Sequence, residues 1–76
     1  MSEYLDLRGT PCPANFVRCR LALEALNQNN TLQVDLDRGE PEETVLSGLR
    51  KEGYEIKIIQ IEGNWIRFLV KINGST

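Results

Sequence analysis

The sequence predicts an α+β fold, a two-layer α/β sandwich in which two helices cover one face of a four-stranded mixed sheet. Three observations support this prediction. Two segments show the 3.6-residue spacing of apolar side chains that is typical of amphipathic helices. Four shorter segments alternate between apolar and polar residues or are rich in β-branched and aromatic residues, as strands are. Their order is β-α-β-α-β-β, and the 76 residues are expected to form a single domain, 1–76, with an ordered core from about 4 to 72.

The first strand is expected at Tyr4–Arg8, where Leu5 and Leu7 lie on one side and charged residues on the other. The segment 9–11 then interrupts the alternation with glycine and proline. Pro13 suits the first turn of a helix, because the N–H that proline lacks would have no partner inside the helix there. A helix is therefore expected directly after this short loop.

The first helix is expected to run from Pro13 to about Asn27. Its apolar stripe is predicted to face the core and consists of Phe16, Cys19, Ala22, Leu23 and Leu26. Val17 and Leu21 are four residues apart and lie off that stripe. They either flank the core or form a small exposed apolar patch.

The second strand is expected at Thr31–Asp37. Its alternation places Leu32, Val34 and Leu36 inward and Gln33, Asp35 and Asp37 outward. A second helix is expected to open at Pro41, with acidic residues in its first turn, basic residues in its last and Gly53 just past its end. These positions agree with the helix dipole and with glycine as a C-terminal cap. The predicted buried face carries Val45, Leu46 and Leu49.

The last two strands, Tyr54–Ile61 and Trp65–Ile72, are expected to form a β-hairpin. One face of the second of these strands carries Ile66, Phe68, Val70 and Ile72. The first changes phase between Ile58 and Ile59, which indicates a β-bulge or burial on both sides. Trp65 is expected to pack across the hairpin, and residues 73–76 are expected to form a loose tail.

Composition excludes several classes of function. Nine basic and eleven acidic residues give a net charge of −2 without a basic stripe, so direct binding of nucleic acid is not expected. The chain has no histidine, which removes histidine-based acid–base chemistry and most zinc sites, and neither a metal nor a cofactor is expected. No apolar run approaches the ~20 residues of a membrane span, and the N-terminus does not resemble a secretory signal. We therefore expect a cytoplasmic protein that does not associate with membranes.

The two cysteines, Cys12 and Cys19, must be explained separately. Seven positions along one helix separate them by roughly 10 Å, whereas a disulfide needs Cα atoms within about 7 Å. Cys19 lies in the apolar stripe and is expected to pack in the core. Cys12 directly precedes Pro13, at the helix N-cap or beside it, where unpaired N–H groups and the helix dipole favour a thiolate. A persulfide would gain from the same donors, and Arg8 could add positive charge. Local pattern alone leaves Cys12 either reactive or structural.

The residues around Cys12 also resemble the sequence motif of a known family. The segment Leu5-Asp6-Leu7-Arg8-Gly9-x-x-Cys12-Pro13 resembles the opening signature of the TusA/SirA/YedF family of small sulfur-carrier proteins. The segments 37–41 and 52–55 resemble the family's second region, and the similarity runs roughly from Tyr4 to Ile72. The resemblance implies that Cys12 accepts sulfane sulfur as a persulfide and that Pro13 sets the helix start.

The same resemblance implies partners. The donor would be a cysteine desulfurase or a rhodanese-like protein, and an acceptor protein would take the sulfur onward in tRNA thiolation, molybdenum-cofactor work or sulfur oxidation. The chain would then be a transfer component of sulfurtransferase type rather than a self-contained enzyme. Arg8 and Gly9 are the supporting residues before the cysteine, and Val17 and Leu21 are the candidate partner-binding residues.

One position departs from the family's usual Cys-Pro-x-Pro motif, because Asn15 stands in the place of the second proline. A second proline would stiffen the first helical turn, whereas Asn15 offers a side chain that can hydrogen-bond near the sulfur. The change keeps the nucleophile and bears on the fit to a partner and on the pathway.

An alternative is a non-catalytic regulatory or RNA- or protein-binding module that has lost sulfur transfer. The predicted fold resembles the C-terminal domain of a bacterial translation initiation factor, but the acidic balance argues against RNA. Asp35 and Asp37 resemble a carboxylate pair, yet solvated charges on an outer strand face are the expectation. Gly39 and Gly63 are expected in turns and form no phosphate-binding loop.

Overall fold

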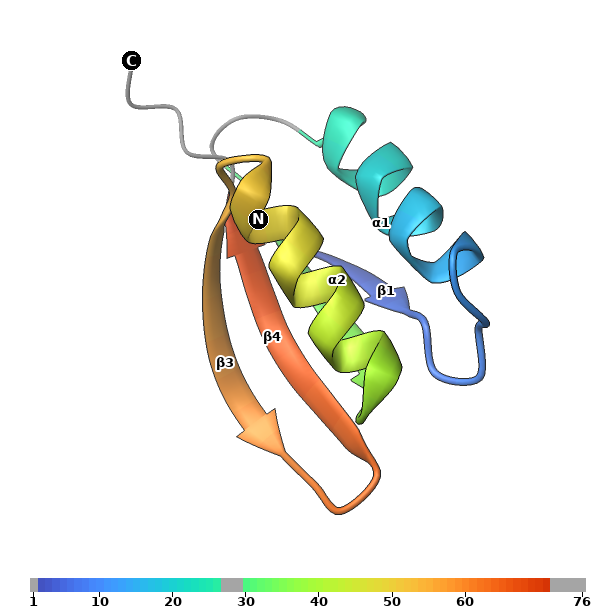
Figure 1. Cartoon of the computed structure of the whole chain (residues 1–76). Helices are drawn as coiled ribbons and strands as arrows, with labels where there is room; N and C mark the ends of the chain where they lie inside the picture. Colours follow the sequence, from blue (N-terminus) through green and yellow to red (C-terminus); the bar gives the residue numbers. More distant parts are fainter. Residues whose placement is uncertain (1, 27–29, 72–76) are drawn as a thin grey trace.

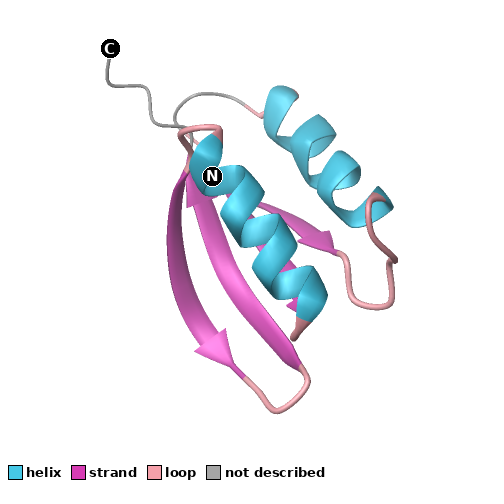
Figure 2. Ribbon diagram, viewed as in Figure 1, coloured by secondary structure: helices cyan, strands magenta, loops and turns pink. Residues whose placement is uncertain are grey.

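The computed structural model describes residues 2–26 and 30–71. The elements along the chain are β1 (Ser2–Asp6), α1 (Ala14–Glu24), β2 (Thr31–Asp37), α2 (Glu40–Lys51), β3 (Glu55–Ile61) and β4 (Trp65–Lys71). The strands form one sheet in the order β1-β2-β4-β3, in which β1 is parallel to β2 and the other neighbours are antiparallel. Both helices cover the same face of this sheet (Figures 1 and 2). The predicted two-layer α/β sandwich with a mixed sheet is therefore confirmed.

Several element boundaries differ from the prediction by a few residues, and among the starts β1 begins at Ser2, α2 at Glu40 and β3 at Glu55. The first strand ends at Asp6 instead of Arg8, because the backbone turns directly afterwards: the N–H of Thr10 donates to the carbonyl of Leu7 at 3.0 Å. The first helix is shorter than predicted, with Pro13 as its N-cap and Glu24 as its last residue. The predicted helix end at Asn27, the strand end at Ile72 and the tail at 73–76 lie outside the described residues.

The core lies between the sheet and the two helices. The predicted inward residues of α2 and β2 are buried, as are Ile66, Phe68 and Val70 of β4, whereas Ile72 lies outside the described residues. On the first helical stripe Cys19, Leu23 and Leu26 are buried, and Phe16 and Ala22 are half-buried against the core. Helix α1 comes close to α2 at Gly48, where an added Cβ would lie 2.6 Å from Cε1 of Phe16. Within the described residues, neither helix is long and apolar enough to cross a membrane.

Strand β3 forms one edge of the sheet and carries the predicted irregularity. The pairing with β4 shifts between Ile58 and Gln60, which places Ile59 in a β-bulge and confirms the phase change expected there. Ile58, Ile59 and Ile61 are between 40% and 55% exposed, and we call these three side chains the β3 edge. A bulge and a charged residue such as Lys57 are devices that discourage pairing with a further strand.

The outer face of the sheet corrects one expectation, because Asp35 is fully buried rather than solvated. Its carboxylate accepts a hydrogen bond of 2.6 Å from the Tyr4 hydroxyl and two, of 2.7 and 2.9 Å, from the Arg67 guanidinium. Tyr4 and Arg67 extend from β1 and β4, the strands on either side of β2, and cover the carboxylate. The Arg67 hydrogen bonds hold the pKa of Asp35 below its ordinary value, and hydrogen bonding to Asp35 raises the pKa of Tyr4.

Candidate functional site

Cys12 lies at the end of the loop that joins β1 to α1. Its thiol is free and exposed, and the residue stands directly before Pro13, the N-cap of α1. The Cys12–Pro13 peptide bond is cis. The helix starts with the N–H of Asn15 donating to the carbonyl of Pro11 at 3.0 Å and that of Val17 to the carbonyl of Pro13 at 3.1 Å. The positive end of the α1 dipole therefore lies beside Cys12.

The loop before Cys12 contains a tight turn over residues 7–10. Gly9 occupies its third position with φ +79°, a conformation that side chains other than glycine rarely adopt. The N–H of Gly9 donates to Oδ2 of Asp37 at 2.8 Å. Leu7, which opens the turn, is fully buried and its N–H donates to the carbonyl of Asp35 at 2.8 Å. The loop is therefore held to β2 at two points.

The Arg8 side chain contacts Asp6 and Trp65 at the end of β1. Its guanidinium makes two hydrogen bonds to Asp6, of 2.9 and 3.0 Å, and lies 5.3 Å from the centroid of the Trp65 ring. Hydrogen bonding between Arg8 and Asp6 raises the pKa of the guanidinium and lowers that of the carboxyl. Arg8 therefore links the end of β1 to the hairpin, and its charge is paired with that of Asp6.

Trp65 contacts two guanidinium groups, that of Arg67 on its own strand and that of Arg8 after β1. The Arg67 guanidinium lies 5.2 Å from the ring centroid, in addition to that of Arg8. Trp65 stands opposite Asp37 in the register of β2 and β4. The indole therefore links the hairpin to the strand ends that carry the cysteine loop.

Asn15 is buried in the first turn of α1. Its Oδ1 accepts the N–H of Phe16 at 2.6 Å, so the side chain satisfies one of the free amides at the helix start. In the part of the chain that the structure describes, its Nδ2 has no hydrogen-bond partner. The expected hydrogen bond near the sulfur is thus replaced by one to the helix backbone.

Cys19 is fully buried on the inner side of α1, as predicted. Burial raises the pKa of its thiol to about 12, so it stays protonated at neutral pH. A protonated, inaccessible thiol is a poor nucleophile. The two cysteines therefore differ in environment, because Cys12 is exposed and Cys19 is buried and protonated.

An apolar patch lies on α1, the helix that begins just after Cys12. Val17 and Leu21 are 49% and 60% exposed, so the sequence alternative of an exposed pair is the correct one. We call this pair the α1 patch. A shallow groove of about 250 Å³ runs past it and is lined by Phe16, Val17, Arg20, Leu21 and Glu24. Arg20 forms salt bridges with Glu24 and Glu52, so the rim of the groove is charged.

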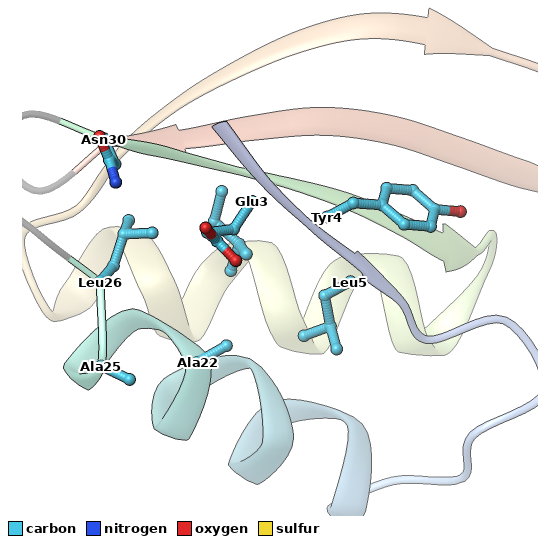
Figure 3. A pocket seen from close by; sticks show the side chains of 8 residues that line it. Glu3, Tyr4, Leu5, Ala22, Ala25, Leu26 and Asn30 are labelled. Carbon is cyan, nitrogen blue, oxygen red and sulfur yellow. The ribbon is translucent and has the colours of Figure 1, made fainter. Parts of the chain in front are cut away.

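A second cavity lies away from the cysteine. It has a volume of about 220 Å³ and lies between β1, the second half of α1 and the start of β2. Figure 3 shows Leu5 on the side of β1 that faces α1, and Tyr4 on the opposite side of the strand. Cys12 lies before the other end of α1, so this cavity is separate from the candidate site.

The outward carboxylates of β2 do not form the pair that their spacing suggests. Asp35 contacts Tyr4 and Arg67, whereas Asp37 accepts the Gly9 amide. Among residues 2–26 and 30–71, no group of three or more Cys, Asp or Glu side chains is placed to hold a metal ion. The sequence contains no local signal for the contact between Asp37 and Gly9, because 28 positions separate the two residues.

Comparison with solved structures places the molecule in a fold class. The crystal structure of a SirA-like protein from Desulfitobacterium hafniense matches with a TM-score of 0.74 at 20% identity, covering 92% of this chain and 95% of that one. The two proteins therefore share the SirA-like fold, a small sandwich in which the first strand leads into the first helix.

The sequence comparisons identify the family. The sequence model of the family described as "Sulfurtransferase TusA" matches residues 3–72 of this chain. The "Putative sulfur carrier protein" of Archaeoglobus fulgidus is 31% identical over 62 residues, which make up 82% of this chain and 70% of that protein. The chain belongs to the TusA sulfurtransferase family, and it is a TusA-like sulfur carrier in the general sense of that family.

Proposed function

We propose that Cys12 accepts sulfane sulfur as a persulfide and relays it to an acceptor protein. The observation that carries this proposal is the contrast between the two thiols of a TusA-family chain. Cys12 is exposed beside the start of a helix, whereas Cys19 is buried and has a pKa of about 12. Only the first can meet a partner's sulfur.

The transfer balances without an external oxidant or reductant. The Cys12 thiolate attacks the outer sulfur of a persulfide on the donor, the sulfur–sulfur bond of the donor breaks, and the donor cysteine leaves as a thiolate. In the second step a nucleophile of the acceptor attacks the outer sulfur on Cys12, and Cys12 leaves as a thiolate. Because Cys12 is exposed, its proton exchanges with solvent, and no histidine is needed.

The partners that this chemistry requires are a donor, such as a cysteine desulfurase or a rhodanese-like protein, and a sulfur acceptor. The α1 patch is the docking surface that we assign to them. Val17 and Leu21 expose apolar area five and nine residues after Cys12, and the adjoining groove is rimmed by the salt bridges of Arg20. An apolar centre with a charged rim is typical of protein–protein contacts.

Mass spectrometry tests the proposal directly. The purified chain is incubated with a cysteine desulfurase and cysteine, and its intact mass is measured before and after reduction. We expect a gain of ~32 Da, one persulfide sulfur, that is reversed by dithiothreitol. Cys12→Ser should abolish the gain and Cys19→Ser should retain it. If the wild-type chain gains no sulfur from a desulfurase or a rhodanese-like donor, the alternative of a binding module without sulfur transfer replaces the proposal.

A further inference from the structure

Asp37 holds the backbone of the cysteine loop from a strand that is distant in sequence. Its Oδ2 accepts the Gly9 N–H at 2.8 Å, across 28 positions of sequence. Asp37 is the last residue of β2, and its backbone is paired with Trp65 of β4. The acceptor therefore lies at the end of an inner strand of the sheet, and the donor lies on the loop.

Gly9 is the residue at which that loop has most freedom. It adopts φ +79° in the turn that starts at Leu7, and no heavy atom of another segment lies within 4 Å of where its Cβ would be. No side chain packs at Gly9 itself, whereas Leu7 at the start of the turn is buried in the core. The turn is secured by the hydrogen bond from Thr10 to Leu7 within it and by the bond from Gly9 to Asp37. A hydrogen bond to a carboxylate is stronger than one between neutral groups.

From this geometry we propose that Asp37 is a positioning residue for sulfur transfer, and the inference rests on the proposed function of Cys12. By holding the Gly9 amide, the carboxylate fixes the loop that carries Cys12 three residues later. Sulfur exchange requires the attacking sulfur to be aligned with the sulfur–sulfur bond of the donor, and small misplacements of reacting atoms are costly. Asp37 acts on this alignment and does not touch the reacting sulfur.

Two substitutions at this position separate the hydrogen bond from the charge. Asp37→Ala removes the acceptor, and Asp37→Asn keeps a carbonyl oxygen for Gly9 while removing the charge. The matched control is Asp35→Asn, which changes a carboxylate on the same strand and the same face, with Tyr4 and Arg67 as its partners instead of the loop. This control lowers stability without releasing Gly9, so it reports what destabilisation alone does.

The first measurement is the single-turnover rate of persulfide loading from a saturating cysteine desulfurase, well below the melting temperature of each variant. We expect Asp37→Ala to load about tenfold more slowly than wild type, which corresponds to about 1.4 kcal/mol of barrier. Asp37→Asn should recover the rate to within about threefold of wild type, and Asp35→Asn should load at the wild-type rate. Alkylation of Cys12 by iodoacetamide should change less than about twofold in all three, because a small reagent does not need the aligned loop.

The second measurement is amide hydrogen exchange at Gly9 by NMR, which reports the anchor without any sulfur chemistry. Exchange should accelerate about tenfold or more in Asp37→Ala and remain near wild type in Asp35→Asn. If wild type loads and Asp37→Ala loads equally fast, the positioning role is wrong while the proposed function stands. If wild type takes no sulfur, the proposed function fails and the positioning role fails with it. Should Asp37→Ala not fold, Asp37→Ser replaces it under the same criteria.

Discussion

The two helices approach closely at Gly48, and the aromatic ring of Phe16 decides whether Gly48→Ala raises or lowers the stability of the protein. Gly48 lies inside α2, where alanine forms helix better than glycine by about 1 kcal/mol. On helix propensity alone, Gly48→Ala would stabilise the protein. The added methyl group, however, would lie 2.6 Å from Cε1 and 3.0 Å from Cζ of Phe16 on α1.

The clash is expected to outweigh the propensity. Carbon atoms in contact normally stand about 3.5 to 4.0 Å apart, so the Phe16 ring must move by about 1 Å. The ring belongs to a half-buried side chain that packs against the core, and it cannot turn aside as the end of a lysine can. Overpacking of this kind costs about 1 to 3 kcal/mol. After the gain of about 1 kcal/mol in propensity, we expect Gly48→Ala to destabilise the protein by about 1 kcal/mol and to lower Tm by about 4 to 8 °C.

A double-mutant cycle with Phe16→Ala isolates the ring. In the Phe16→Ala background the methyl group meets no ring, so Gly48→Ala should stabilise the protein by up to about 1 kcal/mol. Ser47→Ala, at the neighbouring exposed position of α2, is the control and should stay within about 0.5 kcal/mol of its parent. Urea unfolding followed by circular dichroism gives all of these free energies. Equal destabilisation by Gly48→Ala in both backgrounds would refute the argument that the clash with the Phe16 ring causes the loss of stability.

Three further predictions concern the thiols, acid stability and docking. At pH 8 the native chain should show one thiol that reacts quickly with Ellman's reagent, and two in denaturant, because the pKa of the buried Cys19 is about 12; two fast thiols in the native chain would contradict the assignment. The hydrogen bonds to Arg67 lower the pKa of Asp35 from 3.8, so the folded chain binds fewer protons at this carboxyl than the unfolded chain. The ionised Asp35 therefore stabilises the fold above about pH 4, and this stabilisation is lost as the pH falls further. Urea unfolding at pH 7 and pH 3 should therefore show a smaller pH effect in Asp35→Asn than in wild type, and an equal effect would show that another group is responsible. Leu21→Lys should raise the KM of the chain as sulfur acceptor of a cysteine desulfurase at least about threefold, because an apolar contact is lost, with Tm unchanged. The control Ser47→Lys on α2 should leave this KM as it is. An unaltered KM in Leu21→Lys would exclude the α1 patch as the docking surface.

The secondary structure could be predicted well because its signals are local. The spacing of Cys19 and Leu23 places both on one side of a helix, and the alternation in β2 and β4 places their apolar residues on one side of a sheet. The bulge at Ile59 was visible as a change of phase within a single strand. Each of these features depends on residues a few positions apart, so the pattern of the sequence contains them.

The site could be predicted only in part, because its contacts join distant segments. The place of Cys12 directly before the start of α1 follows from the residues beside it. The burial of Asp35 depends on which strands flank β2, since Tyr4 and Arg67 come from either side, 31 and 32 positions away. The direction of Arg8 likewise depends on Trp65, which reaches the end of β1 through the pairing of β4 with β2. Strand order is a non-local property, so alternation within a strand could not reveal these contacts.

The β3 edge has a practical consequence for work with the purified protein. Strands β1 and β3 are the two outer strands of the sheet, and three interstrand spacings of about 4.8 Å separate them by roughly 14 Å. Exposed isoleucines on an edge strand favour association between chains at high concentration, although the bulge at Ile59 opposes regular strand pairing. Cys12 follows the strand at the opposite edge, so association along β3 is expected to leave its thiol accessible. Turbidity and the content of reactive thiol are therefore expected to vary independently from sample to sample.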